Sequence, residues 1–223
     1  MIKTIATPTV IKNRSGNDAI CFFAQKRSGI AVAQPGASLM SGNPLSYPGL
    51  SLSMPPGPAA LSLQLVISAD LRRLNGIINN PAVVRFLDLI PPVSIERTNA
   101  FFSFAEEHGY LLWTIRMDGA EIIGCAGLLP EDPGTKYART ATFFLYLLPA
   151  FWGRGFGTCA LNHLLVEARR RGLHRLECVV ASTNDRAIRL YERHGFVQEG
   201  VKREAFYYNS RYEDLVMMAV LLD

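Results

Sequence analysis

The sequence predicts an α/β domain in which helices flank both faces of a mixed β-sheet. Strand-like runs at residues 110–116 and 121–129 flank a turn at residues 117–119, which is typical of a β-hairpin. Helical spacing of apolar side chains predicts a helix with one buried face over residues 158–171: Leu161, Leu164, Leu165 and Ala168. The chain has 223 residues, of which 49% are hydrophobic, and this is enough for one such domain with a proper core.

The remaining elements follow in order along the chain. Residues 61–68 alternate as a strand, and residues 70–78 and 81–89 have the pattern of short helices. Ser94 is a good N-cap for a further helix that runs to about His108. The C-terminal half predicts strands near residues 140–148, 175–180, 196–207 and 212–222, with a helix between residues 183 and 195.

Residues 1–60 differ in composition from the rest of the chain. No charged residue occurs between residues 28 and 60, and residues 34–58 are rich in Pro, Gly and Ser. Such a segment lacks the regular apolar spacing that packs a core. We predict a disordered N-terminal extension over residues 1–60, with Met54 as an alternative start, and a folded domain over residues 61–223.

The formal net charge of +4 arises entirely in residues 1–60, because residues 61–223 carry 18 basic and 18 acidic side chains. A general nucleic-acid surface needs clustered positive charge without matching acids, so a nucleic-acid partner is not expected. Arg169, Arg170 and Arg171 form one local cluster before Gly172. This cluster fits favourable charge at a helix C-terminus, or a contact to RNA or to an acidic protein.

The cysteines and the apolar segments limit the partners further. No apolar run approaches the ~18 residues that cross a bilayer, and the N-terminus lacks the apolar region of a secretory signal. The four cysteines lack Cys-x-x-Cys spacing and histidine companions: Cys21, Cys125, Cys159 and Cys178. They are typical of reduced thiols in a cytoplasmic protein, and we expect neither a metal nor a membrane partner.

Gly153, Gly155 and Gly157 stand at alternate positions between a strand-like run and a helix that we expect to begin near Thr158. Glycine adopts positive φ and has no Cβ, so successive N–H groups, including that of Arg154, can turn toward one phosphate. The helix adds unpaired N–H groups and the positive end of its dipole. The segment is therefore a candidate phosphate or pyrophosphate site that needs no metal.

Three other interpretations fit these glycines less well. A Walker loop requires Gly-Lys-Ser/Thr, whereas Gly157 is followed directly by Thr158. Residues 155–160 match the dinucleotide fingerprint G-x-G-x-x-A, with Glu177 at about the right distance for a ribose, but residues 149–152 separate them from the preceding strand. A glycine-rich turn that binds nothing explains one or two glycines, but poorly explains three.

Asn184 and Tyr191 lie seven residues apart in the helix predicted between residues 183 and 195. Seven residues make two turns, so both side chains fall on one helix face and can line one groove. Gly195 is typical of a helix C-terminus, and Phe196 begins the next predicted strand.

These motifs resemble the GNAT superfamily of acyl-CoA-dependent N-acyltransferases. In that family a strand ending in Val/Leu-x-Pro precedes [Gln/Arg/Trp]-x-x-Gly-x-Gly/Ala, which is similar to Leu147-Leu148-Pro149 and Trp152-x-x-Gly155-x-Gly157. The second family signature is similar to Asn184, Leu190-Tyr191 and Gly195-Phe196. The resemblance covers roughly residues 61–223 and is strongest after Phe143. It implies the GNAT fold with a mostly antiparallel sheet, in the branch of ribosomal-protein N-terminal and small-amine acetyltransferases.

The resemblance also implies transfer of an acetyl group from acetyl-CoA to a primary amine. Main-chain groups beside Leu147 would bind the pantetheine amides, and Asn184 would contact the pantetheine arm. The N–H groups of the glycine segment would hold the pyrophosphate: Gly153, Arg154, Gly155, Gly157 and Thr158. Tyr191 would protonate the leaving sulfur. One of Arg186, Arg189 and Arg193 could reach the 3′-phosphate.

The general base and the acceptor stay open. Many members of the branch carry a glutamate where this chain has Thr142, which cannot act as a base. The alternatives are a water relay or one of four acids: Glu131, Asp132, Glu199 and Glu204. The acceptor is the amine of a protein N-terminus or of a small amino compound. The walls expected for its groove are the helices of residues 70–108 and the hairpin around residues 206–209. These walls are aromatic and apolar rather than strongly acidic, which disfavours a polyamine somewhat.

Two rival classes of function remain at this point. A catalytically silent acyl-CoA sensor is suggested by the missing glutamate, and an RNA-associated module is suggested by the arginines at residues 169–171. A homodimer is an open alternative to a monomer.

Overall fold

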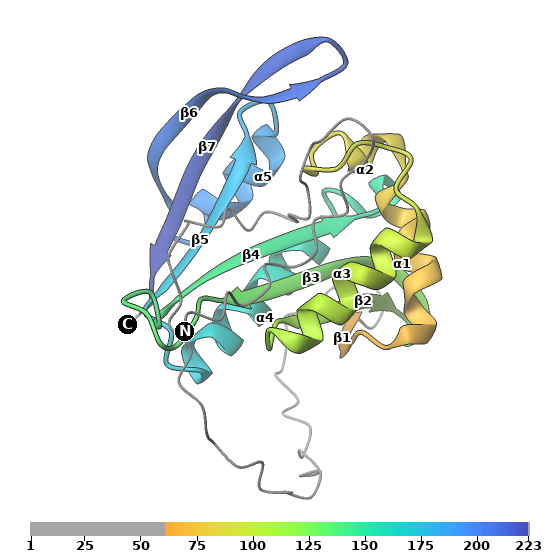
Figure 1. Ribbon diagram of the computed structural model, residues 1–223, viewed down its shortest axis with the longest axis horizontal. Coiled ribbons are helices and arrows are strands. Elements are labelled where there is room, and N and C mark those ends of the chain that lie inside the picture. Colours follow the sequence, from red (N-terminus) through yellow and green to blue (C-terminus); the bar gives the residue numbers. More distant parts are fainter. Residues whose placement is uncertain (1–60, 223) are drawn as a thin grey trace, which may run out of the picture.

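A seven-stranded β-sheet forms the centre of the computed structural model, which describes residues 61–222 (Figure 1). The strands lie in the order β1-β2-β3-β4-β5-β7-β6. All neighbouring pairs are antiparallel except β4 and β5, which are parallel. The strands are β1 (Leu61–Leu65), β2 (Leu111–Met117), β3 (Glu121–Pro130), β4 (Thr140–Leu147), β5 (Arg175–Ala181), β6 (Val197–Tyr208) and β7 (Arg211–Leu221). The predicted mixed, mostly antiparallel sheet is confirmed.

Helices cover both faces of this sheet, as predicted (Figure 1). One face carries α1 (Leu71–Ile78), α2 (Pro81–Val84) and α3 (Ile95–Glu107), and the other carries α4 (Phe156–Arg170) and α5 (Asp185–Glu192). Each face has its own buried apolar cluster. Because side chains alternate along a strand, β4 contributes Phe143 and Leu147 to the α4 side and Phe144 to the α1 side.

Three predicted boundaries differ from the structure. β1 ends at Leu65, and a short 3₁₀ helix, η1 (Ser68–Asp70), follows it. The helix predicted over residues 81–89 ends at Val84, because Leu87 and Leu89 are buried in an irregular segment and gave the sequence a helical pattern. α4 begins at Phe156, two residues earlier than predicted, with Gly155 as its N-cap.

The predicted extension over residues 1–60 and the alternative start at Met54 lie outside the described residues. Within residues 61–222, no helix is long and apolar enough to cross a membrane. The arginine cluster lies at the end of α4, where Arg170 and Arg171 are each 3.9 Å from the carboxylate of Glu167. These contacts favour the first interpretation of the cluster, in which it supplies favourable charge at a helix C-terminus.

The parallel pair β4 and β5 is joined over three residues only. Thr140, Ala141 and Thr142 pair with Arg175, Leu176 and Glu177, and beyond this point the two strands diverge (Figure 1). β5 stays paired with β7 along its whole length, while β4 stays paired with β3 as far as Leu147. The ring of Phe143 lies at the point of divergence, 5.3 Å from the rings of both Tyr191 and Phe196. The sheet therefore opens in a V between its two halves.

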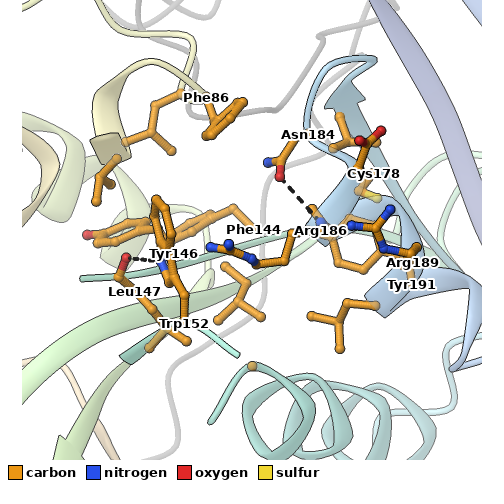
Figure 2. Close-up of a pocket in the computed structure, with 18 of the residues that line it drawn as sticks. Phe86, Phe144, Tyr146, Leu147, Trp152, Cys178, Asn184, Arg186, Arg189 and Tyr191 are labelled. Carbon is orange, nitrogen blue, oxygen red and sulfur yellow. Dashed lines mark hydrogen bonds between the residues drawn. The ribbon is translucent and has the colours of Figure 1, made fainter. Parts of the chain in front are cut away.

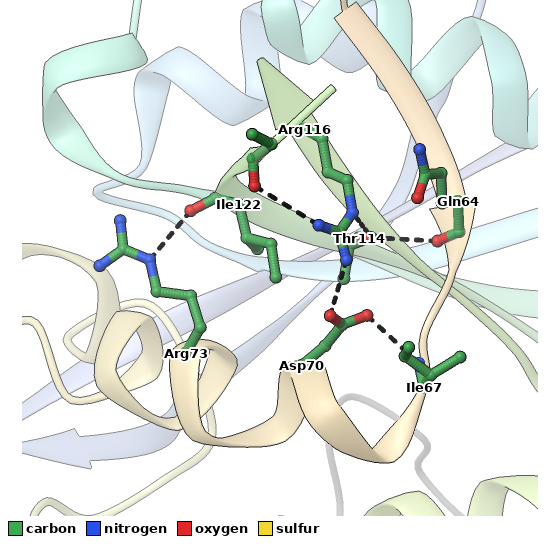
Figure 3. Close-up of polar contacts among 8 residues, drawn as sticks. Gln64, Ile67, Asp70, Arg73, Thr114, Arg116 and Ile122 are labelled. Atoms are coloured by element: carbon green, nitrogen blue, oxygen red, sulfur yellow. Dashed lines mark hydrogen bonds and ion pairs between the residues drawn. The ribbon is translucent and has the colours of Figure 1, made fainter. Parts of the chain in front are cut away.

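A buried ion pair fastens the first helices to the sheet (Figure 3). Asp70, which is 5% exposed, binds Arg116 of β2 at 2.6 Å and accepts the backbone N–H of Ile67. Arg116 also donates to Thr114, whose hydroxyl donates to the carbonyl of Gln64 in β1. This network fixes the start of α1, and with it α2, on the sheet.

We expect Asp70→Ala to reduce the free energy of unfolding by about 3–5 kcal/mol, because it leaves the guanidinium of Arg116 buried without its partner. Urea unfolding followed by circular dichroism measures this. Glu121→Ala is the matched control, since it removes the exposed, 3.7 Å pair with Arg73, and we expect it to cost no more than about 0.5 kcal/mol. Equal losses for the two variants would contradict the role given to the Asp70 pair.

Candidate active site

The V between β4 and β5 holds a cavity of about 720 Å³ (Figure 2). Its walls come from β4, β5, the segment around α2, the glycine loop and α5. The lining includes members of both apolar clusters, such as Phe143 and Tyr191 from one and Val83 and Phe144 from the other. The cavity therefore borders the apolar clusters on both faces of the sheet.

The backbone of β4 offers hydrogen-bonding groups to this cavity. The backbone N–H of Leu148 donates to the carbonyl of Ile123, and the carbonyl of Thr140 accepts the backbone N–H of Glu131. The backbone N–H and C=O groups of the even-numbered residues of β4 therefore point toward β3. The odd-numbered groups, including those of Leu145 and Leu147, consequently face the gap left by β5. Trp152 Nε1 donates to the carbonyl of Leu147 at 2.8 Å. An extended ligand with amide groups can pair with this edge as an additional strand would.

The glycine loop closes one end of the cavity. Gly153 and Gly155 have φ of 71° and 85°, in the left-handed region, and both line the cavity with Gly157 and Thr158. Gly157 lies inside α4 and serves a different purpose, because a Cβ there would be 3.2 Å from the side chain of Leu190. The first turn of α4 leaves its N–H groups without partners in the helix, at the positive end of the dipole. This arrangement fits the predicted anion site.

Arg154 differs from the other residues predicted in this loop, because its side chain does not line the cavity. Its guanidinium lies 5.7 Å and 5.4 Å from the ring centroids of Phe151 and Phe156. Any contact of Arg154 with a ligand is thus left to its backbone N–H.

Helix α5 brings Asn184 and Tyr191 to the same cavity, as predicted. Asn184 is the N-cap of α5, where its Oδ1 accepts the N–H of Ala187 at 3.3 Å, and its amide nitrogen points away from the helix into the cavity (Figure 2). Tyr191 is 7% exposed, and its ring packs edge-on against Phe143. Burial, with a smaller effect of Cys178, raises the pKa of Tyr191 well above its usual value, so its hydroxyl stays protonated.

Arginines supply most of the charge around the cavity. Arg186, Arg189 and Arg193 project from α5 and its end, and Arg85 follows α2. The guanidinium of Arg186 stacks 4.6 Å from the ring centroid of Trp152. Positive charge next to the glycine loop favours a polyanionic ligand.

The side of the cavity toward α2 is aromatic and apolar. It is formed by Val83, Phe86, Leu87, Phe144 and Tyr146, and the rings of Phe144 and Tyr146 are stacked with centroids 5.9 Å apart. Gly127 of β3 makes room for Phe144, because a Cβ there would lie 2.2 Å from the ring. Burial raises the pKa of Tyr146 well above its usual value, so this wall carries a neutral phenol.

The structure does not bring the four acids considered as general bases to the cavity. Glu131 and Asp132 follow β3, beside the end of β4 that is paired with β5. Glu199 accepts hydrogen bonds from Arg175, and this contact holds the pKa of the Glu199 carboxyl below its usual range. The backbone N–H of Glu204 donates to the carboxylate of Asp214. Thr142, at the position of the family glutamate, is buried and does not line the cavity.

A family model described as "Acetyltransferase (GNAT) family" matches residues 81–196, which include the cavity-lining glycine loop and α5. The chain belongs to the GNAT acetyltransferase family. The match begins at α2 and ends at Phe196, so it contains both signatures on which the resemblance was based. This GNAT domain is therefore assigned as an acetyltransferase by its family.

Individual relatives support this assignment. The chain is 26% identical over 163 residues to spermidine N(1)-acetyltransferase of Vibrio cholerae, covering 72% of this chain and 92% of the relative. A ribosomal-protein-alanine N-acetyltransferase of Salmonella typhimurium is 36% identical over 72 residues, covering 32% of this chain and 49% of the relative. A crystal structure of the Vibrio cholerae spermidine N-acetyltransferase with CoA and spermine has a TM-score of 0.66 at 26% identity, covering 73% of this chain and 95% of that one.

The groove walls of this GNAT site were predicted only in part. The segment of residues 70–108 contributes Phe86 and Leu87 to the cavity as expected, but the hairpin around residues 206–209 does not line it.

The part of the wall formed by Phe144 and Tyr146 was not predicted, because alternate residues of an apolar strand form no distinctive motif. The position of Arg85 at the cavity was not predicted either, because no motif or residue spacing marks it. Within residues 61–222, no group of three or more His, Cys, Asp or Glu side chains could hold a metal ion.

We expect Gly155→Ala to lower the free energy of unfolding by about 1–2 kcal/mol, because alanine at φ 85° is strained although the space around its Cβ is open. Gly76→Ala is the same substitution in the interior of α1, also with open space, and there we expect a gain of about 0.5–1 kcal/mol. Urea denaturation of both variants tests the pair. A stabilised Gly155→Ala protein would contradict the strained conformation of the loop.

Proposed function

We propose that the chain transfers an acetyl group from acetyl-CoA to a primary amine by direct attack of the amine on the thioester. The observation that carries this proposal is the cavity between β4 and β5, which joins a backbone anion site to an apolar chamber on the opposite face of the sheet. Residues 61–223 are the proposed catalytic domain. The acceptor is the amine of a protein N-terminus or of a small amino compound.

The donor would lie along the edge of β4. The N–H groups of Gly153, Arg154, Gly155, Gly157 and Thr158 would bind its pyrophosphate, and the arginines of α5 its remaining phosphate charge. The gap-facing backbone groups beside Leu147 and the amide of Asn184 would bind the two amides of the pantetheine arm. This places the thioester at the bottom of the V, near Phe143 and Tyr191.

Tyr191 is the proposed donor of a hydrogen bond or proton to the departing sulfur. Its hydroxyl has no hydrogen-bond partner among the described residues, and its ring is fixed between Phe143 and Phe196. A neutral phenol at this position can stabilise a developing thiolate. The catalytically silent sensor is the second candidate function, because no glutamate from the described part of the chain lines the cavity.

The homodimer stays a prediction. The β6–β7 hairpin projects beyond the body of the fold (Figure 1) and exposes Tyr207 and Tyr212, which are 61% and 65% accessible. Sedimentation velocity of the purified chain distinguishes a dimer from a monomer.

We expect excess acetyl-CoA to raise the melting temperature of the purified chain, because a ligand at one hundred times its Kd stabilises the native state by ~2.7 kcal/mol. Gly155→Glu places a carboxylate in the anion site, and a folded Gly155→Glu protein is expected to show no shift. Scanning calorimetry with and without acetyl-CoA measures both. If saturating acetyl-CoA leaves the parent unchanged, the proposed donor site is wrong.

We expect Tyr191→Phe to lower kcat by about 100-fold and to change the Kd of acetyl-CoA by no more than about twofold, because only the hydroxyl is removed and the ring packing remains. Tyr207→Phe removes an exposed hydroxyl and serves as the control. Thiol release under saturating amine gives kcat, and calorimetry gives Kd. An unchanged kcat would remove Tyr191 from the mechanism, while thiol release that never exceeds hydrolysis would support the sensor.

A further inference from the structure

The chain between α1 and α3 makes one closed excursion from the body of the fold. It begins at Asn80, which is the N-cap of α2, and it ends at Val93, shortly before α3. Every cavity-lining residue that precedes β4 in the chain lies in this excursion, at positions 82, 83 and 85–87. Figure 2 shows Phe86, from this segment, across the cavity from Tyr191. The contacts that hold the two ends of residues 80–93 therefore set the position of one wall of the cavity.

Asn79 holds the far end of this excursion with both halves of its side-chain amide. Its Oδ1 accepts the backbone N–H of Val93 at 2.8 Å, and its Nδ2 donates to the carbonyl of the same residue at 2.9 Å. A residue of a neighbouring antiparallel strand makes the same pair of contacts, so the carboxamide substitutes for a peptide group. Nδ2 also donates to the carbonyl of Asn75 at 3.0 Å, which ties the side chain to the last turn of α1.

The near end of the excursion is held by the next residue in the chain. Asn80 Oδ1 accepts the N–H of Ala82 at 3.0 Å, and the carbonyl of Asn80 accepts the N–H groups of Val83 and Val84. Two consecutive asparagines at the end of α1 therefore fasten both ends of the segment. The excursion is closed like a ring, and its position follows that of α1.

Apolar packing alone fixes this segment less precisely than the hydrogen bonds do. Leu87, Leu89 and Val93 are buried, but hydrophobic contacts have no direction and allow a loop to slide. The contact of Asn79 with Val93 has a direction and a register, because moving another residue into the place of Val93 breaks both hydrogen bonds. Misplacing a reacting group by about 1 Å costs as much as ~100-fold in rate. The position of this wall therefore matters for a reaction in the cavity.

We propose that Asn79 is a positioning residue for the apolar side of the cavity. By holding both backbone groups of Val93, it fixes the wall of Val83, Phe86 and Leu87 where an apolar group of the acceptor can pack against it. The inference rests on the proposed transfer function and adds a residue that does not itself line the cavity. The glycine loop, the edge of β4 and α5 belong to other parts of the chain, so Asn79 acts on the use of the amine and not on the binding of acetyl-CoA.

Two substitutions separate the hydrogen bonds of Asn79 from the space that its side chain fills. Leucine has a similar branched shape and offers neither bond. Aspartate can accept the N–H of Val93, but as a carboxylate it has no hydrogen to donate to the carbonyls of Val93 and Asn75. We expect neither residue to hold the excursion as asparagine does.

Thiol release by the full chain at saturating acetyl-CoA tests the proposal with two pairs of amines: phenethylamine with ethylamine, and the dipeptide Phe-Gly with Ala-Gly. Within each pair the apolar group differs in size, so the ratio of the two kcat/KM values reports the apolar wall. Any difference in basicity within a pair is the same for parent and variant. We expect the parent to prefer the larger member of each pair, and Asn79→Leu to lower that preference by about fivefold or more. The Kd of acetyl-CoA, measured by calorimetry, should change by no more than about twofold, since the donor side is untouched.

Asn75→Leu is the matched control, because it is the same substitution one turn earlier in α1. It removes three donations, to the carbonyls of Val93 and Ser94 and to Thr98 Oγ1. Both contacts of Asn79 with Val93 remain. We expect both variants to lower the melting temperature, because each leaves polar groups without a partner, but only Asn79→Leu to lower the preference for the larger amines. All rates are measured well below the melting temperatures of the variants.

Asn79→Asp should not restore the preference of the parent, and Asn79→Ala replaces Asn79→Leu if the latter does not fold. Equal losses of preference in Asn75→Leu and Asn79→Leu, or the preference of the parent in Asn79→Asp, would overturn the proposal. So would a loss of acetyl-CoA affinity in Asn79→Leu as large as its loss of amine use, or a parent that prefers the smaller amine of each pair.

Failure of this proposal is distinguishable from failure of the transfer function. If the parent uses the amines and Asn79→Leu has the same preference, the transfer function stands and only the role of Asn79 fails. If acetyl-CoA binds and none of the four amines accelerates thiol release by the parent, both fail.

Discussion

The divergence of β4 from β5 is the constraint on which the site depends. A continuous sheet would pair the odd-numbered backbone groups of β4 with β5, whereas here pairing stops after Thr142. The backbone groups of Leu145 and the N–H of Leu147 then face a gap, while the carbonyl of Leu147 accepts from Trp152 Nε1. Buried backbone groups need partners, so the gap favours a ligand with amides spaced like those of a strand. The aromatic rings of Phe143, Tyr191 and Phe196 fill the base of the V and prevent the strands from closing.

The alternation of side chains along β4 gives the two ends of the cavity different chemistry. Odd positions face the core of α4 and α5, where the glycine loop and the arginines form the proposed anion site. Even positions face the core of α1 to α3, where Phe144 and Tyr146 form part of an apolar chamber. One strand thus separates the proposed donor site from an apolar chamber. The Asp70–Arg116 pair joins the start of α1, which precedes the chamber wall in the chain, to β2 of the sheet.

Local signals in the sequence were sufficient for most of the fold. The turn after β2, the cap at Ser94 and the helical spacing in α4 each depend on neighbouring residues, and these elements have the predicted type. The cavity depends on long-range packing, so the divergence at Thr142 and the place of Phe144 and Tyr146 in the cavity wall could not be predicted from spacing. The glycines and the pair Asn184 and Tyr191 were identified in advance because backbone conformation and helical periodicity restrict which residues can stand there.

Burial of Tyr191 limits what its hydroxyl can do in the proposed reaction. A phenol whose pKa is raised by burial is a weaker acid than a thiol, whose reference pKa is about 8.5, so full transfer of its proton to the thiolate is unfavourable. A hydrogen bond from the hydroxyl can still stabilise the sulfur as charge develops on it. The proton that finally neutralises the thiolate must then come from the acetylated nitrogen, directly or through Tyr191 as a relay. In the proposed reaction the proton that leaves the nitrogen is therefore the one that neutralises the thiolate, so no separate base is required. This is consistent with a cavity that holds neutral phenols and arginines rather than a glutamate.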